Sequence, residues 1–451
     1  MGNCTKDKVL SFDRAVPRYT SYPTSPHFHE GFSDADYRAW LAQLPSDDAI
    51  SFYVHVPFCQ RLCWFCGCHT KITLRESPVI DYADYLVREI DLLACALQTR
   101  PAIKHLHFGG GSPTILPLNS YRRVMDTISE VFPFTKGAEI AVEIDPRNFT
   151  EGMAATYAKS GVNRVSFGVQ DFDDTVMKAV NRPQPYGVVY RSIDLAREYG
   201  INNINIDLMY GLPYQTIETM EKLADNVLTL APDRIALFGY AHVPWMKKHM
   251  RLIPDEALPD ISLRYDLFEV MARRLEAAGY EAIGIDHFAK KNDALAVAAR
   301  GGTLRRNFQG YTADAAKSLL AIGASAIGQL PQGYVQNTIH VPQYRDRIDA
   351  GKLPVEKSRV LTDDDRLRAR IIEHLMSAAH VDLDAVCGTA KAAEFTPAIE
   401  ELRKFELAGL LDIKGNSITV KNRFAVRLAC AAFDSYLRPV SETGQRHVTA
   451  I

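Results

Sequence analysis

The chain contains the stretch Tyr53-Val54-His55-Val56-Pro57-Phe58-Cys59-Gln60-Arg61-Leu62-Cys63-Trp64-Phe65-Cys66-Gly67-Cys68-His69-Thr70, which carries half of its eight cysteines within ten residues. The apolar, β-branched run Ser51–Val56 overlaps its start and predicts a buried strand. Three of the cysteines have the spacing C-x3-C-x2-C, which on a loop lets three thiolates converge on one metal site. A [4Fe–4S] cluster normally takes four cysteines, so a set of three leaves one iron open for another ligand.

Other readings of the cysteines fit less well. A structural zinc site usually takes two cysteine pairs about a dozen or more residues apart, and no second pair follows this loop at that separation. A disulfide framework is disfavoured because no secretory signal precedes the loop. An electron-transfer ferredoxin would have a fourth ligand and a much shorter chain. The loop therefore indicates an iron–sulfur enzyme with an open coordination position. We expect the other cysteines to be small apolar residues or free thiols: Cys4, Cys95, Cys387 and Cys430.

The loop resembles the cluster motif of the radical S-adenosylmethionine (radical SAM) superfamily, C-x3-C-x-φ-C, in which an aromatic residue precedes the third cysteine. Phe65 is that aromatic residue here. The longer pattern YVHVPFC-x3-CWFCGC, with Cys68 as a fourth cysteine, resembles the oxygen-independent coproporphyrinogen III oxidase (dehydrogenase) family of haem biosynthesis.

Length and composition fit a large catalytic domain with a smaller companion. The chain has 451 residues, 47% of them hydrophobic, and a formal net charge of -2. That charge gives no bulk attraction to nucleic acid or membrane, and no apolar run is long enough to span a bilayer. An iron–sulfur cluster and free thiols both predict a reducing, cytoplasmic location.

Strand and helix patterns alternate from Ser51 to about Gly239. Six such β-α units predict a parallel sheet, with its chemistry at the carboxyl ends of the strands. The pattern alone does not exclude a doubly wound open sheet, whereas the resemblance implies a partial (β/α)6 barrel of radical SAM type. The expected strands are 51–56, 104–108, 138–144, 164–169, 203–209 and 234–238. The expected helices are 81–97, 119–131, 150–159, 186–199 and 217–230.

Three regions follow from this division: an N-terminal arm (1–50), a catalytic barrel with its extension (51–345) and a C-terminal domain (346–451). Beyond the six units we expect a helix over 263–278, a strand over 281–286 and a small apolar stretch over 321–328. Residues 305–312 are predicted to be a polar loop and 341–354 a link. The C-terminal domain should contain helices over 366–378, 398–408 and 422–436, with a hairpin of strands 410–413 and 417–420. This order suggests a winged-helix-like module. It shows no concentrated basic face for DNA, so we expect it to cover the active site.

Polar residues fall at or just beyond successive strand ends. Phe108-Gly109-Gly110-Gly111-Ser112-Pro113-Thr114 follows a strand, and its three glycines let the backbone approach a ligand, although a tight turn needs none. Glu143 and Asp207 lie within apolar strands, where a carboxylate requires a partner or a ligand. Gln170 and Arg182 follow the fourth strand. Each residue alone has a structural explanation, but together they predict one pocket.

The resemblance extends over nearly the whole chain, from PRYTSYPT at 17–24 to the C-terminal helix, and it assigns roles to individual positions. Cys59, Cys63 and Cys66 match the ligands of a [4Fe–4S] cluster. The family binds two S-adenosylmethionine molecules. Tyr53, Gly110, Glu143 and Ile327 match the positions that contact one of them. Phe65, Gly111, Ser112, Gln170, Arg182, Asp207 and Ala241 match those that contact the other. Catalytic parts are implied for Tyr53 and for Cys68, which matches an extra cysteine needed for activity but not for holding the cluster.

The resemblance also implies a reaction. A reduced cluster cleaves S-adenosylmethionine to methionine and a 5′-deoxyadenosyl radical, and the radical removes hydrogen from a propionate β-carbon of coproporphyrinogen III. Loss of CO2 and an electron leaves a vinyl group, and two rounds give protoporphyrinogen IX. The expected partners are a flavodoxin- or ferredoxin-like one-electron donor and an electron acceptor, and the family suggests a monomer. Cationic anchors for the propionates are expected, with Arg18, Arg305 and Arg306 as candidates.

Three alternatives remain. Haem chaperones related to this family typically lack the fourth cysteine and the PRYTSYPT segment, both of which are present here. A haem-degrading radical enzyme would share the barrel but give a different product. A non-catalytic iron–sulfur regulator would not need the row of S-adenosylmethionine positions.

Overall fold

Strand β1 (Ile50–Val56) leads directly into the cysteine stretch and lies in the middle of the sheet. The computed structural model describes residues 2–45 and 48–437. Six strands lie side by side in chain order and all run parallel, which confirms the six predicted β-α units. They are β1, β4 (Ile103–Gly110), β5 (Phe134–Ile144), β6 (Arg164–Gln170), β7 (Asn203–Tyr210) and β8 (Arg234–Gly239).

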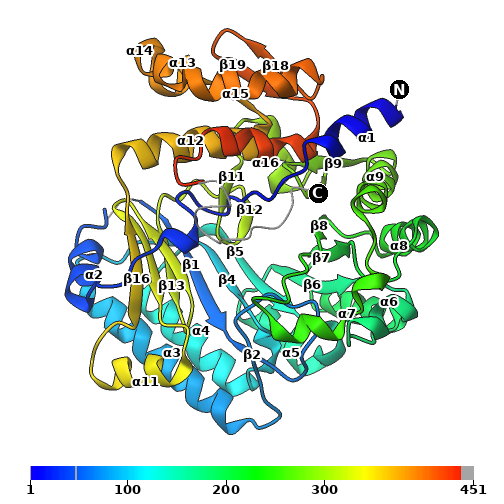
Figure 1. Cartoon of the computed structure of the whole chain (residues 1–451). Helices are drawn as coiled ribbons and strands as arrows, with labels where there is room; N and C mark the ends of the chain where they lie inside the picture. The colour runs from blue at the N-terminus through cyan, green and yellow to red at the C-terminus, as the bar shows by residue number, and fades with distance from the viewer. Residues whose placement is uncertain (1, 46–47, 438–451) are drawn as a thin grey trace.

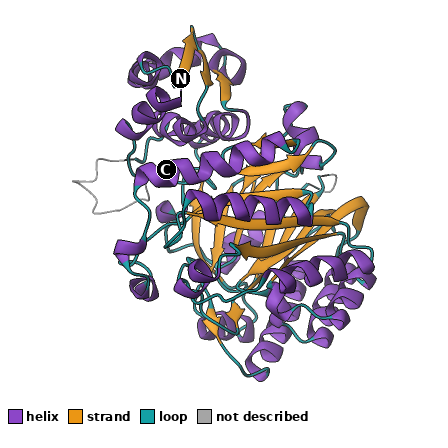
Figure 2. Cartoon of the chain, turned by 90° about the vertical axis from the view of Figure 1, so that its right-hand side faces the viewer, coloured by secondary structure: helices purple, strands orange, loops and turns teal. Residues whose placement is uncertain are grey.

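Helices connect these strands and cover the outer face of the sheet (Figures 1 and 2). In α3 the side chains of Leu86, Ile90 and Leu93 are buried, as expected for an amphipathic helix packed on a sheet. The connecting helices are α3 (Ser77–Ala96), α4 (Leu118–Val131), α5 (Glu151–Lys159), α6 (Asp174–Ala179), α7 (Tyr186–Glu198) and α8 (Ile217–Leu230). The short helix α6 was not predicted.

The sheet continues beyond the six strands on both sides and remains open, which makes it a partial barrel (Figure 1). On one side β13 (Leu319–Ile322) pairs with β1 in parallel, followed by the antiparallel strands β14 (Ile327–Leu330), β15 (Gly333–Asn337) and β16 (Val355–Val360). On the other side β10 (His287–Lys290) and β9 (Tyr280–Ile283) follow β8. The predicted strand over 281–286 therefore ends early, at a hairpin turn.

Several segments differ from the predictions. Residues 305–312 form a hairpin, β11 (Arg305–Asn307) and β12 (Gly310–Thr312), rather than a loop. The turn is held locally, since the Asn307 side chain accepts a 2.9 Å hydrogen bond from the backbone N–H of Gln309. The predicted link contains helix α11 (Val341–Asp349). The arm contains α1 (Gly2–Ser11) and α2 (Asp34–Leu41), which begins with a capping box at Ser33.

The C-terminal module lies above the sheet in Figure 1. Its hairpin is where the sequence placed it, while its last helix ends four residues early. It consists of α12 (Asp363–Ala378), β17 (His380–Asp382), α13 (Leu383–Cys387), α14 (Thr389–Ala392), α15 (Thr396–Leu407), β18 (Leu411–Lys414), β19 (Ser417–Val420) and α16 (Arg423–Ala432). Two further helices, α9 (Ile261–Ala277) and α10 (Ala294–Arg300), belong to the barrel extension. The division into three regions stays a prediction, and residues 46–47 and 438–451 lie outside the described part of the chain. No helix among the described residues is long and apolar enough to cross a membrane.

A buried carboxylate joins α3 to the antiparallel edge of the sheet. Glu89 is 2% exposed and accepts three hydrogen bonds, from Gly323 N (2.7 Å), Tyr344 Oη (2.6 Å) and Asn337 Nδ2 (2.7 Å). Asn337 Nδ2 also donates to the Gly323 carbonyl at 2.9 Å, so the Asn337 amide cannot turn over without losing a bond. Glu89 therefore holds α3, β15 and α11 together. Each of the three donors around it needs a hydrogen-bond acceptor at this position, which the carboxylate supplies.

Glu89→Gln should lower the free energy of unfolding by about 1–3 kcal/mol, because an amide N–H₂ would face the Asn337 N–H₂ and leave buried donors unpaired. Urea unfolding followed by circular dichroism measures the change. The control is Asp91→Asn on the exposed side of the same helix, which should stay within about 0.5 kcal/mol of wild type. Equal stability of the two variants would contradict this role.

Candidate active site

The cysteine stretch forms a closed loop at the carboxyl end of β1. Its two ends pair as short parallel strands, β2 (Phe58–Cys59) and β3 (Lys71–Ile72). The N–H of Lys71 donates to the Pro57 carbonyl at 2.7 Å, and that of Thr73 donates to the Cys59 carbonyl at 3.0 Å. The intervening residues, which carry Cys63, Cys66 and Cys68, are thereby confined to one compact loop.

Two distant segments hold the middle of this loop from outside. Asn181 Nδ2 donates to the Leu62 carbonyl at 2.8 Å. From the segment after β8, Lys247 Nζ donates to the Cys68 carbonyl at 3.0 Å, and His249 Nε2 lies 2.8 Å from the Cys66 carbonyl. Lys247 and His249 were not predicted from the sequence. No motif marks them, because they meet the loop only through the fold.

One cavity of about 370 Å³, which we call the loop cavity, brings together most of the predicted site. Its lining includes every predicted cluster ligand and all but two of the predicted S-adenosylmethionine positions. The predicted residues that line this cavity are Cys59, Cys63, Phe65, Cys66, Cys68, Gly110, Gly111, Ser112, Glu143, Gln170, Arg182, Asp207 and Ala241. Tyr53 and Ile327 do not belong to that lining. Residues that were not predicted also line it, among them Met209, Val243 and Met250.

The glycine turn after β4 lies directly against the cysteine loop. Gly111 N donates to the Val56 carbonyl at 2.8 Å, and Ser112 N donates to the Phe58 carbonyl at 2.9 Å. A Cβ atom on Gly111 would stand 2.6 Å from the Phe58 carbonyl oxygen, which is a clash with backbone. Gly110 has a φ of +117°, a conformation that L side chains rarely adopt. These glycines therefore permit the close approach of two backbones.

Glu143 joins the glycine turn to the interior of the barrel. Its Oε2 accepts a 3.1 Å hydrogen bond from Gly110 N, and its Oε1 lies 3.1 Å from His107 Nε2. Tyr53 lies close by, with its ring stacked on His107 and its hydroxyl 3.0 Å from His55 Nδ1. Tyr53 is thus near Glu143 although it does not line the loop cavity.

Arg182 places positive charge beside the cysteines. Its Nη1 lies 3.4 Å from Cys63 Sγ and 3.4 Å from Asp145 Oδ2, and its Nη2 donates to the Gly168 carbonyl. Gln170, two residues beyond Gly168, has a φ of +71°, at a shift in the β6–β7 register. A left-handed conformation for a glutamine is uncommon and is typical of functional sites.

Asp207 is a half-buried carboxylate in β7. Ser166 Oγ and Asn205 Nδ2 donate to it at 3.0 and 2.9 Å. Burial raises the pKa of Asp207 to about 6, the charge of Glu143 adds to the rise, and these hydrogen bonds oppose it. A hydroxyl or ammonium group of a bound molecule would stabilise the ionised form.

The cysteines that line the loop cavity differ in acidity. Burial raises the pKa of Cys59 to about 12, whereas a hydrogen bond with the Cys68 side chain lowers the pKa of Cys66 below its usual range. Within the described residues, no group of three or more His, Cys, Asp or Glu side chains is placed to hold a metal ion. A [4Fe–4S] cluster distributes its cysteine ligands over separate irons, so the sulfurs need not meet at one point. Three cysteines on one cavity, beside the cation of Arg182, fit such a cluster. Cys95, Cys387 and Cys430 are free and scattered, as predicted, and the side chain of Cys4 lies outside the described ones.

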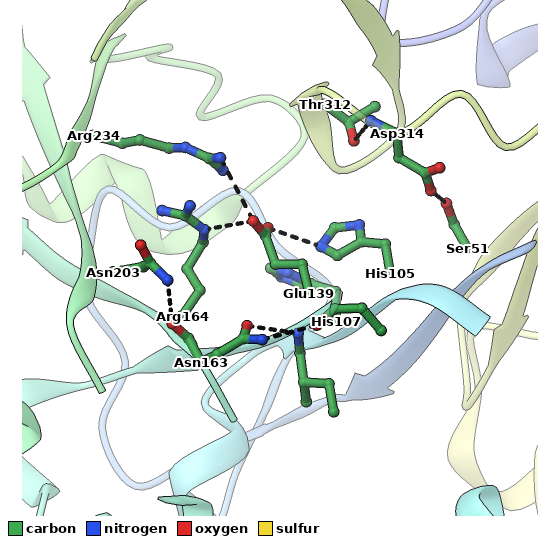
Figure 3. Close-up of polar contacts among 12 residues, drawn as sticks. Ser51, His105, His107, Glu139, Asn163, Arg164, Asn203, Arg234, Thr312 and Asp314 are labelled. Carbon is green, nitrogen blue, oxygen red and sulfur yellow. Dashed lines mark hydrogen bonds and ion pairs between the residues drawn. The ribbon is translucent and has the colours of Figure 1, made fainter. Parts of the chain in front are cut away.

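A second polar region lies deeper in the barrel (Figure 3). The Glu139 carboxylate lies 2.9 Å from Arg164 Nε, 3.5 Å from Arg234 Nη2 and 3.3 Å from His105 Nε2. Burial would raise the pKa of Glu139, but the His105 hydrogen bond and the two guanidinium charges outweigh it and hold the pKa well below its usual value. The charges of this network are paired within the protein, so we interpret it as a structural link between four strands. Some buried donors of His105 and Arg164 make no hydrogen bond among the described residues, and the network lines a further cavity of about 410 Å³.

Gly111→Ala should lower the free energy of unfolding by about 1–3 kcal/mol, because the new methyl group collides with the Phe58 backbone. Gly67→Ala is a matched control in the cysteine loop, since no atom lies within 4 Å of its added Cβ. Thermal unfolding of both variants measures the effect. A Gly111→Ala protein as stable as Gly67→Ala would contradict the close packing of loop and turn.

Comparison with known proteins agrees with this geometry. The model of the radical SAM superfamily matches residues 53–227. The chain is 45% identical to the oxygen-independent coproporphyrinogen III oxidase of Bradyrhizobium diazoefficiens, over 98% of this chain and 99% of the relative. It is 42% identical to the protein of that name from Paracoccus denitrificans, over 95% and 96%. The solved structure of coproporphyrinogen III oxidase (HemN) from Escherichia coli, described as a radical SAM enzyme, superimposes with a TM-score of 0.88 at 35% identity, covering 94% of this chain and all of that one. The chain therefore belongs to the oxygen-independent coproporphyrinogen III oxidase family of the radical SAM superfamily.

Proposed function

We propose that this protein oxidatively decarboxylates two propionate side chains of coproporphyrinogen III to vinyl groups without oxygen, giving protoporphyrinogen IX in haem biosynthesis. The observation that carries the proposal is the loop cavity, where three cysteines and the strand-end residues Glu143, Gln170 and Asp207 line one space. The high identity to the named oxidases over nearly the full chain supports this substrate.

The cofactors would occupy the loop cavity. Cys59, Cys63 and Cys66 would hold a [4Fe–4S] cluster, with S-adenosylmethionine beside it. When bound, the cluster supplies one electron that cleaves S-adenosylmethionine to methionine and a 5′-deoxyadenosyl radical, the species that takes hydrogen from the propionate β-carbon. A second S-adenosylmethionine, near Tyr53, Gly110, Glu143 and Ile327, is part of this proposal.

The chain's own residues would bind and orient these molecules. Gly110 and Gly111 border the cavity without side chains that would obstruct a ligand, and Ser112 borders it beside them. The carboxylates of Glu143 and Asp207 can accept hydrogen bonds from ammonium and hydroxyl groups. Arg182 would offset the negative charge of cluster thiolates, since its guanidinium lies beside Cys63. We assign Cys68 a part in catalysis and none in holding the cluster.

The proposed partners follow from the electron balance. The cluster must be reduced by a one-electron donor of flavodoxin or ferredoxin type, and the second electron of each decarboxylation must leave to an acceptor. The reaction needs neither nucleic acid nor membrane insertion. We expect a monomer working in the cytoplasm, where a reducing environment preserves the cluster.

Anaerobic incubation of the reconstituted protein with coproporphyrinogen III, S-adenosylmethionine and dithionite should yield protoporphyrinogen IX, 5′-deoxyadenosine and CO2. The products are measured by chromatography and mass spectrometry. Formation of 5′-deoxyadenosine without a vinyl product would refute the substrate. Absence of both products from a cluster-loaded protein would refute the reaction class.

Cys63→Ala should lose the visible absorbance of the reconstituted cluster and all 5′-deoxyadenosine formation, because a ligand is removed. Cys95→Ala is the control, since Cys95 is an exposed, free thiol on α3. Cys68→Ala should keep the cluster absorbance and lose vinyl product. Iron and sulfide analysis accompanies the spectra. Retention of a full cluster by Cys63→Ala would contradict the ligand set.

A further inference from the structure

Next to the loop cavity lies a second cavity of about 210 Å³, which we call the arginine cavity. It shares Arg18, Phe238 and Gly239 with the loop cavity, so the two border each other. Five arginines contribute to its lining: Arg18, Arg264, Arg306, Arg423 and Arg427. They come from the N-terminal arm, helix α9, the β11–β12 hairpin and helix α16. Four separate parts of the fold thus bring positive charge to one space.

Two of these arginines are held by contacts within the protein. Arg423 forms an ion pair with Glu276 at 2.8 Å and lies over the rings of Phe268 and Phe288. Arg427 is 8% exposed and donates to the backbone carbonyls of Val16 and Pro17, which fastens the arm to α16. These contacts explain both residues without a ligand.

Arg306 is different. It stacks on Tyr311, with the guanidinium 4.5 Å from the ring centroid, but its Nε and Nη1 atoms are shielded from solvent and have no hydrogen-bond partner within the described structure. Unpaired buried donors are costly, and a guanidinium is suited to bidentate contacts with a carboxylate. Arg306 therefore lines the cavity and carries two buried donors that no acceptor among the described residues satisfies, with the charge of Asp286 acting on its guanidinium.

Two glycines at strand ends leave space for the Arg264 side chain. A Cβ on Gly211, after β7, would overlap the Arg264 guanidinium, and one on Gly239, at the end of β8, would stand 3.3 Å from its Nη2. The group also lies 5.5 Å from the ring centroid of Tyr210. Arg18 reaches the same strand end from the arm, donating to the Gly239 carbonyl at 3.0 Å. Arg18 and Arg264 are thus placed where the two cavities border each other.

Negative charge around the cavity is limited. Asp286 is the only carboxylate among the described residues of the lining; it lies 2.6 Å from His287 Nδ1, and its charge also acts on Arg306 and Arg18. From outside the lining, Asp13 acts electrostatically on Arg264. Burial lowers the pKa of Arg264 and of Arg427, the latter to about 10, and the charge of Arg18 lowers both further. Like charges are therefore held together here, which favours the binding of an anion.

We propose that Arg18, Arg264 and Arg306 form a carboxylate subsite that binds the two propionates of the tetrapyrrole that both decarboxylations leave intact. The inference rests on the proposed function and extends it to substrate recognition. A propionate that reacts must lie in the loop cavity, while those that survive both rounds need an anchor nearby. Phe238, Phe268, Phe308 and Phe424 on the same lining would face the apolar macrocycle. Of the arginines predicted from sequence, Arg305 is not part of this subsite, because it points away and pairs with Glu373 at 2.9 Å.

The test uses the full-length, cluster-reconstituted protein and fluorescence titration with two stable porphyrins. Coproporphyrin III has four propionates and protoporphyrin IX has the two that remain. Arg306→Gln and Arg18→Gln should each weaken binding of both by about ten-fold or more, since each removes charge-assisted hydrogen bonds to a carboxylate. The tetramethyl ester of coproporphyrin should bind wild type and variants alike. Arg305→Gln, the neighbouring residue outside the cavity, is the matched control and should stay within about two-fold.

S-Adenosylmethionine is a second source of carboxylate, so its dissociation constant is measured by equilibrium dialysis with the same proteins. It should be unchanged in Arg306→Gln and Arg18→Gln. Weaker binding of S-adenosylmethionine with unchanged porphyrin binding would overturn the proposal, as would unchanged binding of both. Because Arg18 is exposed, its variant keeps the test valid if Arg306→Gln unfolds. Wild-type turnover of coproporphyrinogen III is assayed separately. If that turnover is present and the variants bind porphyrin like wild type, only the subsite fails; if it is absent, the proposed function fails.

Discussion

The parallel pairing of β1 with β4 is the constraint on which the rest of the site depends. Their register places Val56 opposite Gly110, so the cysteine loop and the glycine turn leave the sheet next to each other. Backbone hydrogen bonds from Gly111 and Ser112 then fasten the turn to the loop. Because all six strands run in the same direction, Glu143, Gln170 and Asp207 arrive at neighbouring positions around the same cavity. One edge of the sheet thus brings together side chains from distant parts of the chain. This geometry suits a cofactor that needs several ligands at once.

Charge is distributed unevenly between the interior regions. Around Glu139 the guanidinium groups of Arg164 and Arg234 meet carboxylates, and the pairs lie within ordinary bonding distance. In the arginine cavity, by contrast, cations outnumber the single carboxylate of the lining. In the first arrangement each cation has a carboxylate partner, and removal of one partner would leave an uncompensated buried charge. The second keeps binding capacity for a ligand and is placed beside the cavity where the chemistry is proposed. The N-terminal arm contributes to both the loop cavity and the arginine cavity, because Arg18 lines each of them.

Regular patterns were the most predictable part of the fold. Alternating apolar strands and amphipathic helices located the six parallel strands, and the C-terminal hairpin was found from its turn residues Lys414, Gly415 and Asn416. Predictions were wrong where a segment's structure depends on a distant partner. The hairpin at 305–312 is polar in sequence, yet Arg305 pairs with Glu373 and Tyr311 donates to the Met376 carbonyl at 2.7 Å. Those contacts with α12 lie about 65 residues away along the chain and leave no local signal.

The sequence by itself determined the residue types of this protein: a loop rich in cysteines, from which the cluster ligands are proposed, carboxylates within apolar strands, and a β-α pattern that predicts parallel strands. These properties depend on residue type and short-range spacing, which can be read along the chain. Only the tertiary structure decided which side chains share a space. It brought Lys247 and His249 to the cysteine loop, left Tyr53 and Ile327 outside the lining of the loop cavity, and separated Arg306 from its neighbour Arg305. The physical reason is that long-range contacts are set by the packing of whole elements, whose crossings and registers no short stretch of sequence encodes.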